Sequence, residues 1–381
     1  MNNVPISITS LQGKLQGKRV LVRAGLNVPI ENGQITDVYR LQNALQTITF
    51  LRNEGAKIIL CGHIGREPIE TLEPVKRVLQ NKMPVIFVKD VFAEDVEAIV
   101  SKAATGGVVL FENLRRWNGE KENDSAFAKR LASCADIYVN DAFPVCHREH
   151  ASITMLPTLL PSYAGIQLEK EVSNLQKAFE PTHPFLFILG GAKVETKMPL
   201  ISSFIGSADT LFVGGVLAND FFRAQNIEIG ISKHSDMLPE NLKDVVNHIT
   251  LPIDVIVERD KKKTFTAIRD IQKEDSIFDA GPDSIALLVK EIQKASLIVW
   301  NGPLGFCEGG YCDATLRVAD AISKSTAYSV VGGGDTLAAV PDDVQNKMSF
   351  ISTGGGAMLT YLAEKQLVGI TALLESQNTL K

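Results

Sequence analysis

The chain has 381 residues, more than one typical domain needs, and this length predicts two large domains or three small ones. Hydrophobic residues make up 45% of the chain and charged residues 22%, which is ordinary for a globular protein with a sizeable core. The net charge of −5 gives no overall attraction for nucleic acids or anionic membranes, and no apolar run is long enough to span a bilayer. We therefore expect small-molecule partners, no nucleic acid and no membrane.

The N-terminal segment and the cysteines indicate the compartment. Residues 1–10 contain no basic stretch followed by an apolar one, so no secretory signal is visible. The five cysteines form no CxxC pair: Cys61, Cys134, Cys146, Cys307 and Cys312. Cys307 and Cys312 lack the His-rich partner segment of a zinc site, and reduced thiols are the expectation for all five. The sequence predicts a cytoplasmic protein.

Short β-branched runs alternate with helix-periodic stretches along nearly the whole chain. In the first half the predicted strands are 18–24, 56–62, 84–90, 106–113 and 136–143, with helical patterns at 38–55, 93–103 and 125–135. In the second half the predicted strands are 185–191, 209–215, 296–302, 327–335 and 349–356. This alternation is typical of parallel sheets covered by helices on both faces. The expected fold class is α/β, with two doubly wound, Rossmann-like domains.

A long helical pattern separates the two halves. Residues 163–180 contain no glycine after Gly165 and are followed by PTHP. A flexible linker would be richer in glycine and serine, so an interdomain helix is expected here. The predicted domains are residues 1–162 and 181–368.

The carboxyl ends of the predicted strands differ between the halves. Ligands of open parallel sheets bind at these ends. The first half carries polar and cationic side chains there: Arg23, Asn27, His63, Arg66, Arg115, Arg116, His147, Arg148 and His150. The second half carries glycines, at 190–191, 214–215, 302, 332–334 and 354–356. Arginines hold small polyanions, and glycine turns let backbone N–H groups approach phosphates. The pattern predicts phosphoryl transfer between a compact anion and a nucleotide.

Other functions are weighed against this one. The chain has no GxxxxGK[ST] and no GxGxxG, which disfavours a P-loop and a dinucleotide-dependent dehydrogenase. HREH at 147–150 has the spacing of half a metal site, but no second ligand pair completes it, and a cationic pocket is the better interpretation. There a bound phosphate would raise the pKa of both histidines. Asp335 could hold Mg²⁺ or cap the following helix, and its spacing leaves both open.

The motifs at these positions resemble phosphoglycerate kinase from about residue 17 to residue 368. The matching segments, in the order and spacing of the family, are VRAGLNVP (22–29), HIGR (63–66), ENLR (112–115), NDAF…HREH (140–150), LGGAKVETK (189–197), WNGPLG (300–305), GGGDT (332–336) and STGGGA (352–357). The resemblance implies reversible phosphoryl transfer between 1,3-bisphosphoglycerate and ADP, giving 3-phosphoglycerate and MgATP. It also implies that the domains close around the 163–180 helix, that 369–381 can join the first domain, and that the enzyme is a monomer.

The resemblance assigns residues to each substrate. The phosphoglycerate site comprises Arg23, Asn27, Arg40, His63, Arg66, Arg115, His147, Arg148 and His150. The nucleotide site comprises Gly191, Lys193, Lys197, Gly215, Asn301, Pro303, Glu308 for the ribose, Gly334, Asp335 for magnesium, and Thr336. The catalytic residues are Arg40, Lys193, Lys197 and Gly355. They neutralise charge on a phosphoryl group that passes in line through a loose transition state, so no general base is required.

The chain departs from the family pattern at several positions. Gly25 stands where the family has an aspartate that contacts the glycerate hydroxyl, and Thr196 stands where aspartate is usual. The other departures are Pro144–Val145, Val216, Phe350 and Thr360. Because of Gly25, one alternative function is a related kinase that forms an acyl phosphate on another small phosphorylated carboxylate. A non-catalytic nucleotide-binding paralogue is the remaining alternative.

Overall fold

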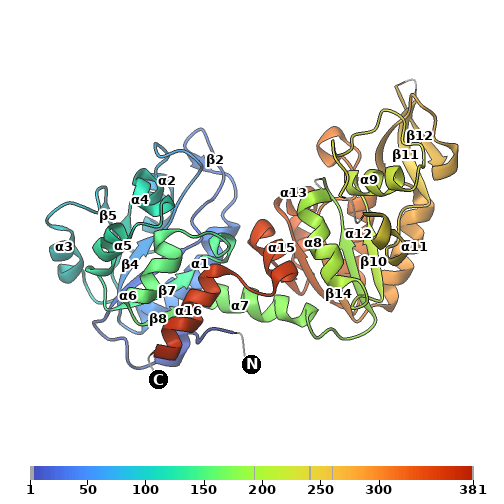
Figure 1. The fold of residues 1–381 in the computed structure, drawn as a ribbon. Helices are drawn as coiled ribbons and strands as arrows, with labels where there is room; N and C mark the ends of the chain where they lie inside the picture. The colour runs from blue at the N-terminus through green and yellow to red at the C-terminus, as the bar shows by residue number, and fades with distance from the viewer. Residues whose placement is uncertain (1–3, 193, 240–241, 260, 380–381) are drawn as a thin grey trace. The chain divides into compact units, whose positions relative to one another are not determined.

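The computed structural model describes residues 4–192, 194–239, 242–259 and 261–379. The chain forms two compact units, residues 1–173 with 366–381 and residues 174–365 (Figure 1). No helix of the described residues is both long and apolar enough to cross a membrane.

A six-stranded sheet forms the core of the first unit, in the order β5-β6-β4-β1-β7-β8. Its strands are β1 (Arg19–Ala24), β4 (Lys57–Cys61), β5 (Val85–Val88), β6 (Val108–Phe111), β7 (Ile137–Asp141) and β8 (Ser162–Ala164). All neighbours pair in parallel, with Val20 opposite both Ile58 and Ile137. The central strands are β-branched and buried on both faces, as parallel sheets require.

Helices and short turns connect these strands. The helices are α1 (Tyr39–Asn53), α2 (Glu73–Gln80), α3 (Val96–Lys102), α4 (Asn118–Lys121), α5 (Ser125–Ala132) and α6 (Leu156–Leu159). The turns are η1 (Ile8–Leu11), η2 (Leu114–Arg116), η3 (Phe143–Val145) and the π-helical η4 (Ala151–Met155), and β2 (Ile30–Glu31) pairs with β3 (Gln34–Ile35). Leu41, Ile48 and Leu51 of α1 lie in one core cluster with Val20 and Ile58, so the predicted amphipathic helix covers the sheet.

The helix predicted at 163–180 is shorter than its sequence pattern suggests. Residues 162–164 form the edge strand β8, because they pair with Tyr138–Asn140 of β7. Helix α7 (Ile166–Leu175) follows, and η5 (Gln176–Ala178) ends the segment. The carboxylate of Asp141 accepts hydrogen bonds from the N–H groups of Gln167 (2.9 Å) and Leu168 (3.1 Å). These two N–H groups have no partner within the helix, and the end of β7 therefore determines where α7 begins.

The C-terminal helix α16 (Val368–Thr379) belongs to the first unit, where it contacts η4, α6 and β8 (Figure 1). The side chain of Gln377 donates to the carbonyls of Ser162 (3.0 Å) and Ile6 (3.3 Å), and it accepts from the N–H of Ile6 (2.9 Å). At the other end of α16, the N–H of Gly369 donates to the carbonyl of Cys146 (2.9 Å). The two ends of the chain are thus hydrogen-bonded to the same sheet edge.

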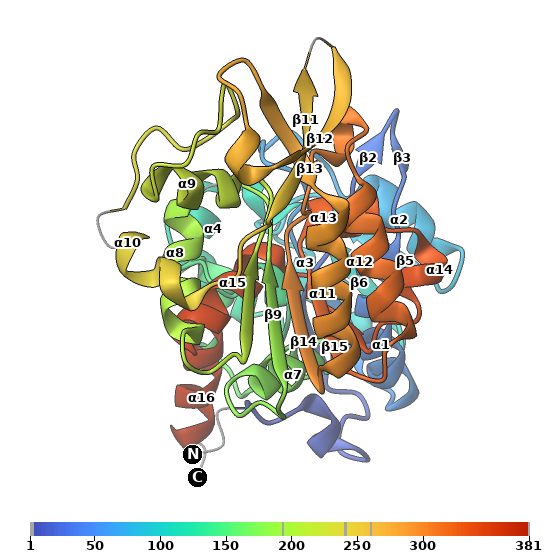
Figure 2. The same cartoon turned by 90° about the vertical axis from the view of Figure 1, so that its right-hand side faces the viewer.

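A five-stranded parallel sheet forms the core of the second unit, in the order β10-β9-β14-β15-β16. Its strands are β9 (Phe185–Leu189), β10 (Thr210–Val213), β14 (Leu297–Asn301), β15 (Tyr328–Gly332) and β16 (Phe350–Ile351). The helices are α8 (Val194–Phe204), α9 (Val216–Ala224), α10 (Leu242–Val245), α11 (Pro282–Lys294), α12 (Asp313–Lys324), α13 (Gly334–Ala339), α14 (Asp342–Gln345) and α15 (Gly355–Glu364). Helix α8 packs beside α15, and α11 beside α12 (Figure 2).

An antiparallel sheet in the second unit has no counterpart among the predicted elements. Strand β11 (Asp254–Arg259) lies between β12 (Lys262–Ala267) and β13 (Ser276–Ala280). Four of the six residues of β12 are polar, and half of the strand is solvent-exposed, so it lacks the apolar pattern on which strand prediction depends. The two parallel sheets confirm the predicted α/β class with Rossmann-like units.

We expect Gly369→Ala to destabilise the first unit. A Cβ at this position would lie 2.7 Å from Cγ2 of Ile153 and 3.2 Å from the Cα of Cys146, so either the helix or the turn must move. Overpacking of this kind costs about 1–3 kcal/mol. Thermal unfolding would measure it, with Gly25→Ala as the control, because a Cβ on Gly25 meets nothing within 4 Å. Equal melting temperatures for the two variants would contradict the tight packing of α16.

Candidate functional site

The first unit brings Arg23 and His63 together at the ends of neighbouring strands. Arg23 is fully buried at the end of β1, and β1 pairs with β4 so that Arg23 lies opposite Cys61, two residues before His63. One terminal nitrogen of Arg23 lies 2.9 Å from Nδ1 of His63. A guanidinium only donates, so Nδ1 of His63 accepts and the imidazole proton is on Nε2. Burial, reinforced by the charge of Arg23, lowers the pKa of His63 well below its usual value. His63 is therefore a neutral N–H donor.

Asn27 connects two further predicted residues, Arg40 and Arg115, through the backbone. Its side-chain oxygen accepts from the N–H of Gly65 (2.8 Å), and its carbonyl accepts from the side chain of Arg40 (2.7 Å). The Arg115 guanidinium, on η2 after β6, donates to the carbonyl of Gly65. The Nε of Arg115 is buried and has no hydrogen-bond partner among the described residues. Arg66, the remaining predicted residue of this segment, is exposed. The loop after β4 therefore holds Arg40 and Arg115 at the same sheet edge.

The HREH segment adds two neutral imidazoles to this site. Burial lowers the pKa of His150 to about 4, with the charges of Arg23, Arg115 and Arg148 acting in the same direction. The Nε of Arg148 donates to Nε2 of His147 (3.2 Å), and burial and that charge lower the pKa of His147. The Nδ1 atoms of both histidines are buried without a partner in the described part of the chain. Unpaired buried polar atoms are costly, and Nδ1 of His150 lies 3.7 Å from the Glu120 carboxylate, beyond hydrogen-bond distance.

The glycine-rich strand ends of the second unit lie close together. The N–H of Gly190 donates to the carbonyl of Asn301 (2.9 Å), and that of Gly191 to the carbonyl of Pro303 (2.8 Å). A Cβ on Gly302 would lie 2.3 Å from the Gly190 carbonyl, and its φ of 95° also excludes most side chains. Glycine is thus required here for two strand-to-helix turns to touch.

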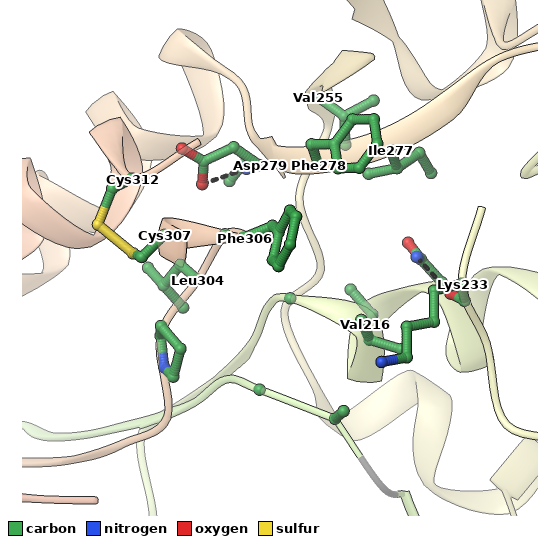
Figure 3. A pocket seen from close by; sticks show the side chains of 18 of the residues that line it. Val216, Lys233, Val255, Ile277, Phe278, Asp279, Leu304, Phe306, Cys307 and Cys312 are labelled. Atoms are coloured by element: carbon green, nitrogen blue, oxygen red, sulfur yellow. Dashed lines mark hydrogen bonds between the residues drawn. A yellow bond between two sulfur atoms is a disulfide. The ribbon is translucent and has the colours of Figure 1, made fainter. Parts of the chain in front are cut away.

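A cavity of about 670 Å³ opens at these turns (Figure 3). Five predicted nucleotide residues line it: Gly191, Gly215, Pro303, Glu308 and Asp335. Other predicted residues of the described part of the chain lie next to this lining. The hydroxyl of Thr336 accepts from the N–H of Gly302 (2.9 Å), Gly334 begins α13, and a Cβ on Gly355 would lie 3.1 Å from the Cα of Gly333.

Most of the remaining wall of the cavity is apolar, and no sequence motif predicted it. It includes Val255 and Phe278 of the antiparallel sheet, and Leu304, Phe306 and Leu316 of the loop and helix after β14. Figure 3 shows Phe306 and Phe278 on the same side of the cavity, with ring centroids 6.1 Å apart. Apolar residues without a motif give no local signal of a binding site, because the same residues build every core. A cavity with an apolar wall and a few polar groups is typical of small-molecule sites.

Lys197 is a buried cation of the second unit. Its ammonium donates to Oδ1 of Asn301 (2.7 Å), and its side chain is only 6% exposed. Burial lowers the pKa of Lys197 to about 8, and the charge of Asp335 acts in the opposite direction. Lys193, the other predicted lysine, lies outside the described residues.

Asp335 meets the requirements of a magnesium ligand that acts together with a substrate. It is exposed in the first turn of α13, it lines the cavity, and no described residue pairs with its carboxylate. The described residues contain no cluster of three or more histidine, cysteine or acidic side chains that could hold a metal. Mg²⁺ commonly takes one or two carboxylates and completes its shell with phosphates and water. The donor set fits that kind of site.

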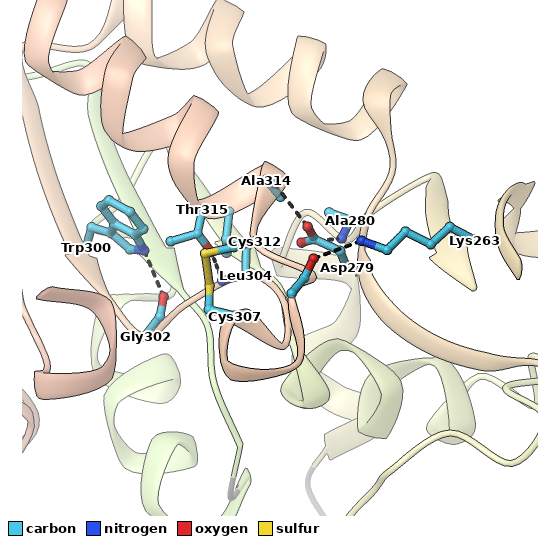
Figure 4. The surroundings of a disulfide bond; sticks show 11 residues. Lys263, Asp279, Ala280, Trp300, Gly302, Leu304, Cys307, Cys312, Ala314 and Thr315 are labelled. Carbon is cyan, nitrogen blue, oxygen red and sulfur yellow. Dashed lines mark hydrogen bonds between the residues drawn. A yellow bond between two sulfur atoms is a disulfide. The ribbon is translucent and has the colours of Figure 1, made fainter. Parts of the chain in front are cut away.

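The expectation of reduced cysteines is wrong for one pair. Cys307 and Cys312 form a disulfide, whereas Cys61, Cys134 and Cys146 are free and buried. Cys307 begins η8 (Cys307–Gly309), which carries Glu308 at the cavity, and Cys312 follows this turn (Figure 4). A bond between residues this close in sequence depends on loop conformation, which composition and spacing do not reveal.

Asp279 and the ring of Tyr311 also hold this loop. The carboxylate of Asp279 accepts from the N–H of Ala314 (3.1 Å) in the first turn of α12, directly after the disulfide (Figure 4). Burial raises the pKa of Asp279 to about 7. The ring of Tyr311 stacks on Phe278 with centroids 4.5 Å apart. The disulfide loop is therefore fixed against β13, the strand that forms one wall of the cavity.

A buried cationic site and a glycine-lined cavity with a free carboxylate, each at the carboxyl edge of a parallel sheet, define a phosphotransferase for a small anion and a nucleotide. Comparison with known proteins agrees. The family model for phosphoglycerate kinase matches residues 9–365, and the chain belongs to the phosphoglycerate kinase family.

Individual relatives span nearly the whole chain. The phosphoglycerate kinase of Dictyoglomus turgidum is 40% identical over 380 residues, which covers 94% of this chain and 96% of the relative. That of Bartonella tribocorum is 41% identical over 384 residues, covering 94% and 97%. The structure of phosphoglycerate kinase from Coxiella burnetii is 37% identical, with a TM-score of 0.83 over 97% of this chain and 99% of that one.

We expect Lys197 to give the reaction an alkaline limit near pH 8. Above this pH the free enzyme loses the ammonium charge, and kcat/KM for the nucleotide, which reports free-enzyme pKa values, should fall. Burial of the Lys197 ammonium destabilises the protein below pH 8, and this effect is relieved as the pH rises. Its pKa is lower folded than unfolded, so the unfolded chain binds more protons between pH 8 and 10.5 and stability rises with pH.

The pH profiles of Lys197→Met and of the exposed Lys347→Met test this assignment. The first variant should lose most of the activity, and the decrease in kcat/KM above pH 8 should disappear. The second variant should keep this decrease. If kcat/KM of Lys197→Met still decreased above pH 8, another titrating group would be responsible for the decrease.

We expect reduction of the disulfide to weaken the second unit and its nucleotide site. Closing so short a loop stabilises a protein by about 2 kcal/mol in the loop-entropy model. A dithiol should lower the free energy of unfolding by up to this amount and raise the KM for the nucleotide, because the segment carrying Glu308 gains freedom. Denaturant unfolding and kinetics would measure both, and the Cys307→Ser/Cys312→Ser variant, already lacking the bond, should not respond. Identical wild-type values with and without the dithiol would contradict this role.

Proposed function

We propose that this chain is a glycolytic phosphoglycerate kinase. It transfers a phosphoryl group reversibly between 1,3-bisphosphoglycerate and ADP, giving 3-phosphoglycerate and MgATP, and is thus a phosphotransferase with a carboxyl group as acceptor. The observation that carries the proposal is the buried cluster of Arg23, His63, Arg115 and His150, a set of cationic and neutral groups that suits a small phosphorylated carboxylate. In the proposed division of roles the first unit binds phosphoglycerate and the second binds the nucleotide.

The proposed phosphoglycerate site combines fixed charge with neutral donors. Arg23, Arg40 and Arg115 supply charge, and the N–H groups of His63, His147 and His150 supply hydrogen bonds without adding charge in the free protein. Arginine forks match carboxylate and phosphate oxygens. Asn27, Arg66 and Arg148 complete the proposed set.

The proposed nucleotide site uses backbone N–H groups and one lysine. Gly191, Gly215 and Gly334 allow the phosphates to approach the backbone, Lys197 supplies charge, and Glu308 faces the ribose. Asn301 holds the Lys197 ammonium in place, while Pro303 and Thr336 fix the turn around Gly302. Asp335 would hold Mg²⁺, which neutralises phosphate charge when it is bound.

Catalysis in this proposal consists of positioning and charge neutralisation. Arg40, Lys193, Lys197 and the N–H of Gly355 at the start of α15 stabilise the equatorial oxygens of the transferring group. The attacking oxygen is already ionised, so no side chain needs to remove a proton. The meeting of the two substrates by hinge closure, the monomeric state and the cytoplasmic location stay predictions.

Neighbouring arginines provide a matched test of the phosphoglycerate site. Arg115→Ala should raise the KM for 3-phosphoglycerate at least about tenfold and leave the KM for MgATP unchanged, since a charge-assisted bond to a ligand is worth roughly 1.5–3 kcal/mol. Arg116→Ala should have little effect, because that side chain pairs with Glu112 (3.2 Å) and is 42% exposed. A coupled assay with both substrates would measure this. Absence of turnover in the well-folded wild type would refute the proposed function itself.

Gly25 offers a test of substrate identity. A Cβ on Gly25 meets nothing within 4 Å, so we expect Gly25→Asp to fold normally. If 3-phosphoglycerate is the native substrate, its kcat/KM should change by less than about tenfold. A gain far above that would indicate that the unmodified site serves another small phosphorylated carboxylate.

A further inference from the structure

A fully buried carboxylate lies beneath the cationic site of the first unit. Glu120, in α4, has no solvent exposure. A negative charge beside an anion site repels the anion, so its presence requires an explanation. We propose that Glu120, acting through Ser152, is a positioning residue that orients Arg23 and His63 for phosphoglycerate.

Glu120 binds Ser152 with both carboxylate oxygens. Oε1 accepts from the Ser152 hydroxyl (2.7 Å), and Oε2 accepts from the Ser152 N–H (3.0 Å). Ser152 lies in the π-helical turn η4, and its carbonyl accepts from the hydroxyl of Tyr138 (2.5 Å). Backbone and side chain of Ser152 are therefore both fixed, and its hydroxyl proton points toward the carboxylate.

The Ser152 hydroxyl passes this orientation to the arginine. Its oxygen accepts from Nε of Arg23 (3.0 Å), while NH1 of Arg23 donates to the Ala24 carbonyl (2.7 Å) and NH2 donates to His63. A guanidinium only donates and a carboxylate only accepts, so the direction of each bond in the series Glu120–Ser152–Arg23–His63 is determined. The end of the series is the neutral His63, whose proton is placed on Nε2.

The buried charge of Arg23 provides a second physical role for Glu120. Arg23 is itself fully buried, and a buried cation without a nearby anion is strongly unfavourable. Glu120 provides that anion on the far side of the Ser152 hydroxyl, close enough that His150 Nδ1 also lies 3.7 Å from its Oε1. Arg23 can thus stay charged and immobile before the substrate arrives, which lowers the entropy lost on binding.

The two effects of Glu120 on substrate binding are opposite in sign, and this makes the proposal testable. If Glu120 contributed charge alone, Glu120→Gln would remove a repulsion and strengthen 3-phosphoglycerate binding. If Glu120 positions Arg23, the weaker acceptor and the less restrained guanidinium should weaken binding. We expect the dissociation constant for 3-phosphoglycerate to rise about tenfold or more, as loss of a charge-assisted hydrogen bond would give. The KM for MgATP should stay within about twofold of the wild type.

Two further variants separate positioning from loss of fold. Ser152→Ala breaks the series but keeps the Glu120 charge, and it should weaken 3-phosphoglycerate binding similarly. Because both residues act on Arg23, the double variant should be little worse than either single one. Asp141→Asn serves as the control, since Asp141 is also buried in the first unit but bonds to α7. It should lower thermal stability and leave 3-phosphoglycerate binding unchanged.

Calorimetric binding of 3-phosphoglycerate and of inorganic phosphate to each full-length variant, with melting temperature recorded, is the decisive measurement. The inference rests on the proposed function only for its ligand. Wild-type protein that binds neither anion would refute the proposed function, whereas tighter or unchanged binding by folded Glu120→Gln and Ser152→Ala would overturn the role of Glu120 alone.

Discussion

Parallel pairing of β1 with β4 and β7 is the constraint on which the cationic site depends. The pairing sets Arg23 opposite Cys61 and Asn140, so the segments that follow these strands emerge at one edge. An isolated arginine or histidine at such an edge would be a solvated side chain. Here burial of Arg23 and His63 in the same network converts two ordinary side chains into a fixed donor array.

Burial also determines which groups of this site carry charge. Desolvation and the nearby arginines lower the pKa values of His63, His147 and His150, so the imidazoles are neutral in the free protein. If the arginines and the histidines of this site were all charged, they would repel one another. Neutral imidazoles let arginine charges be packed closely, and Glu120 offsets part of what remains. The anion selectivity we propose thus depends on hydrogen-bond geometry as much as on net charge.

The second unit uses the same kind of parallel sheet, but glycines stand at the ends of its strands. Its strand ends approach so closely that side chains are excluded, as at Gly302 against Gly190. The open turns expose backbone donors, and the antiparallel sheet adds an apolar wall that contains Val255 and Phe278. Lys197 contributes a buried charge whose pKa of about 8 makes it responsive to arriving phosphates. The two units therefore offer different groups to the anions of the proposed function, side chains in the first unit and mainly backbone N–H groups in the second.

The sequence by itself determined the α/β class, the order of the parallel strands along the chain and the family. It also pointed to strand-end residues that lie at the two sites, because alternating periodicity and strand-end motifs are local signals. The structure alone revealed β11–β13, whose exposed polar strand carries no apolar pattern, and the Cys307–Cys312 bond, which depends on loop conformation. It also revealed Glu120, which no motif marks. Its environment comes from segments 32 residues apart in the chain, joined at Ser152, and only tertiary packing decides that a carboxylate there is buried beside an arginine.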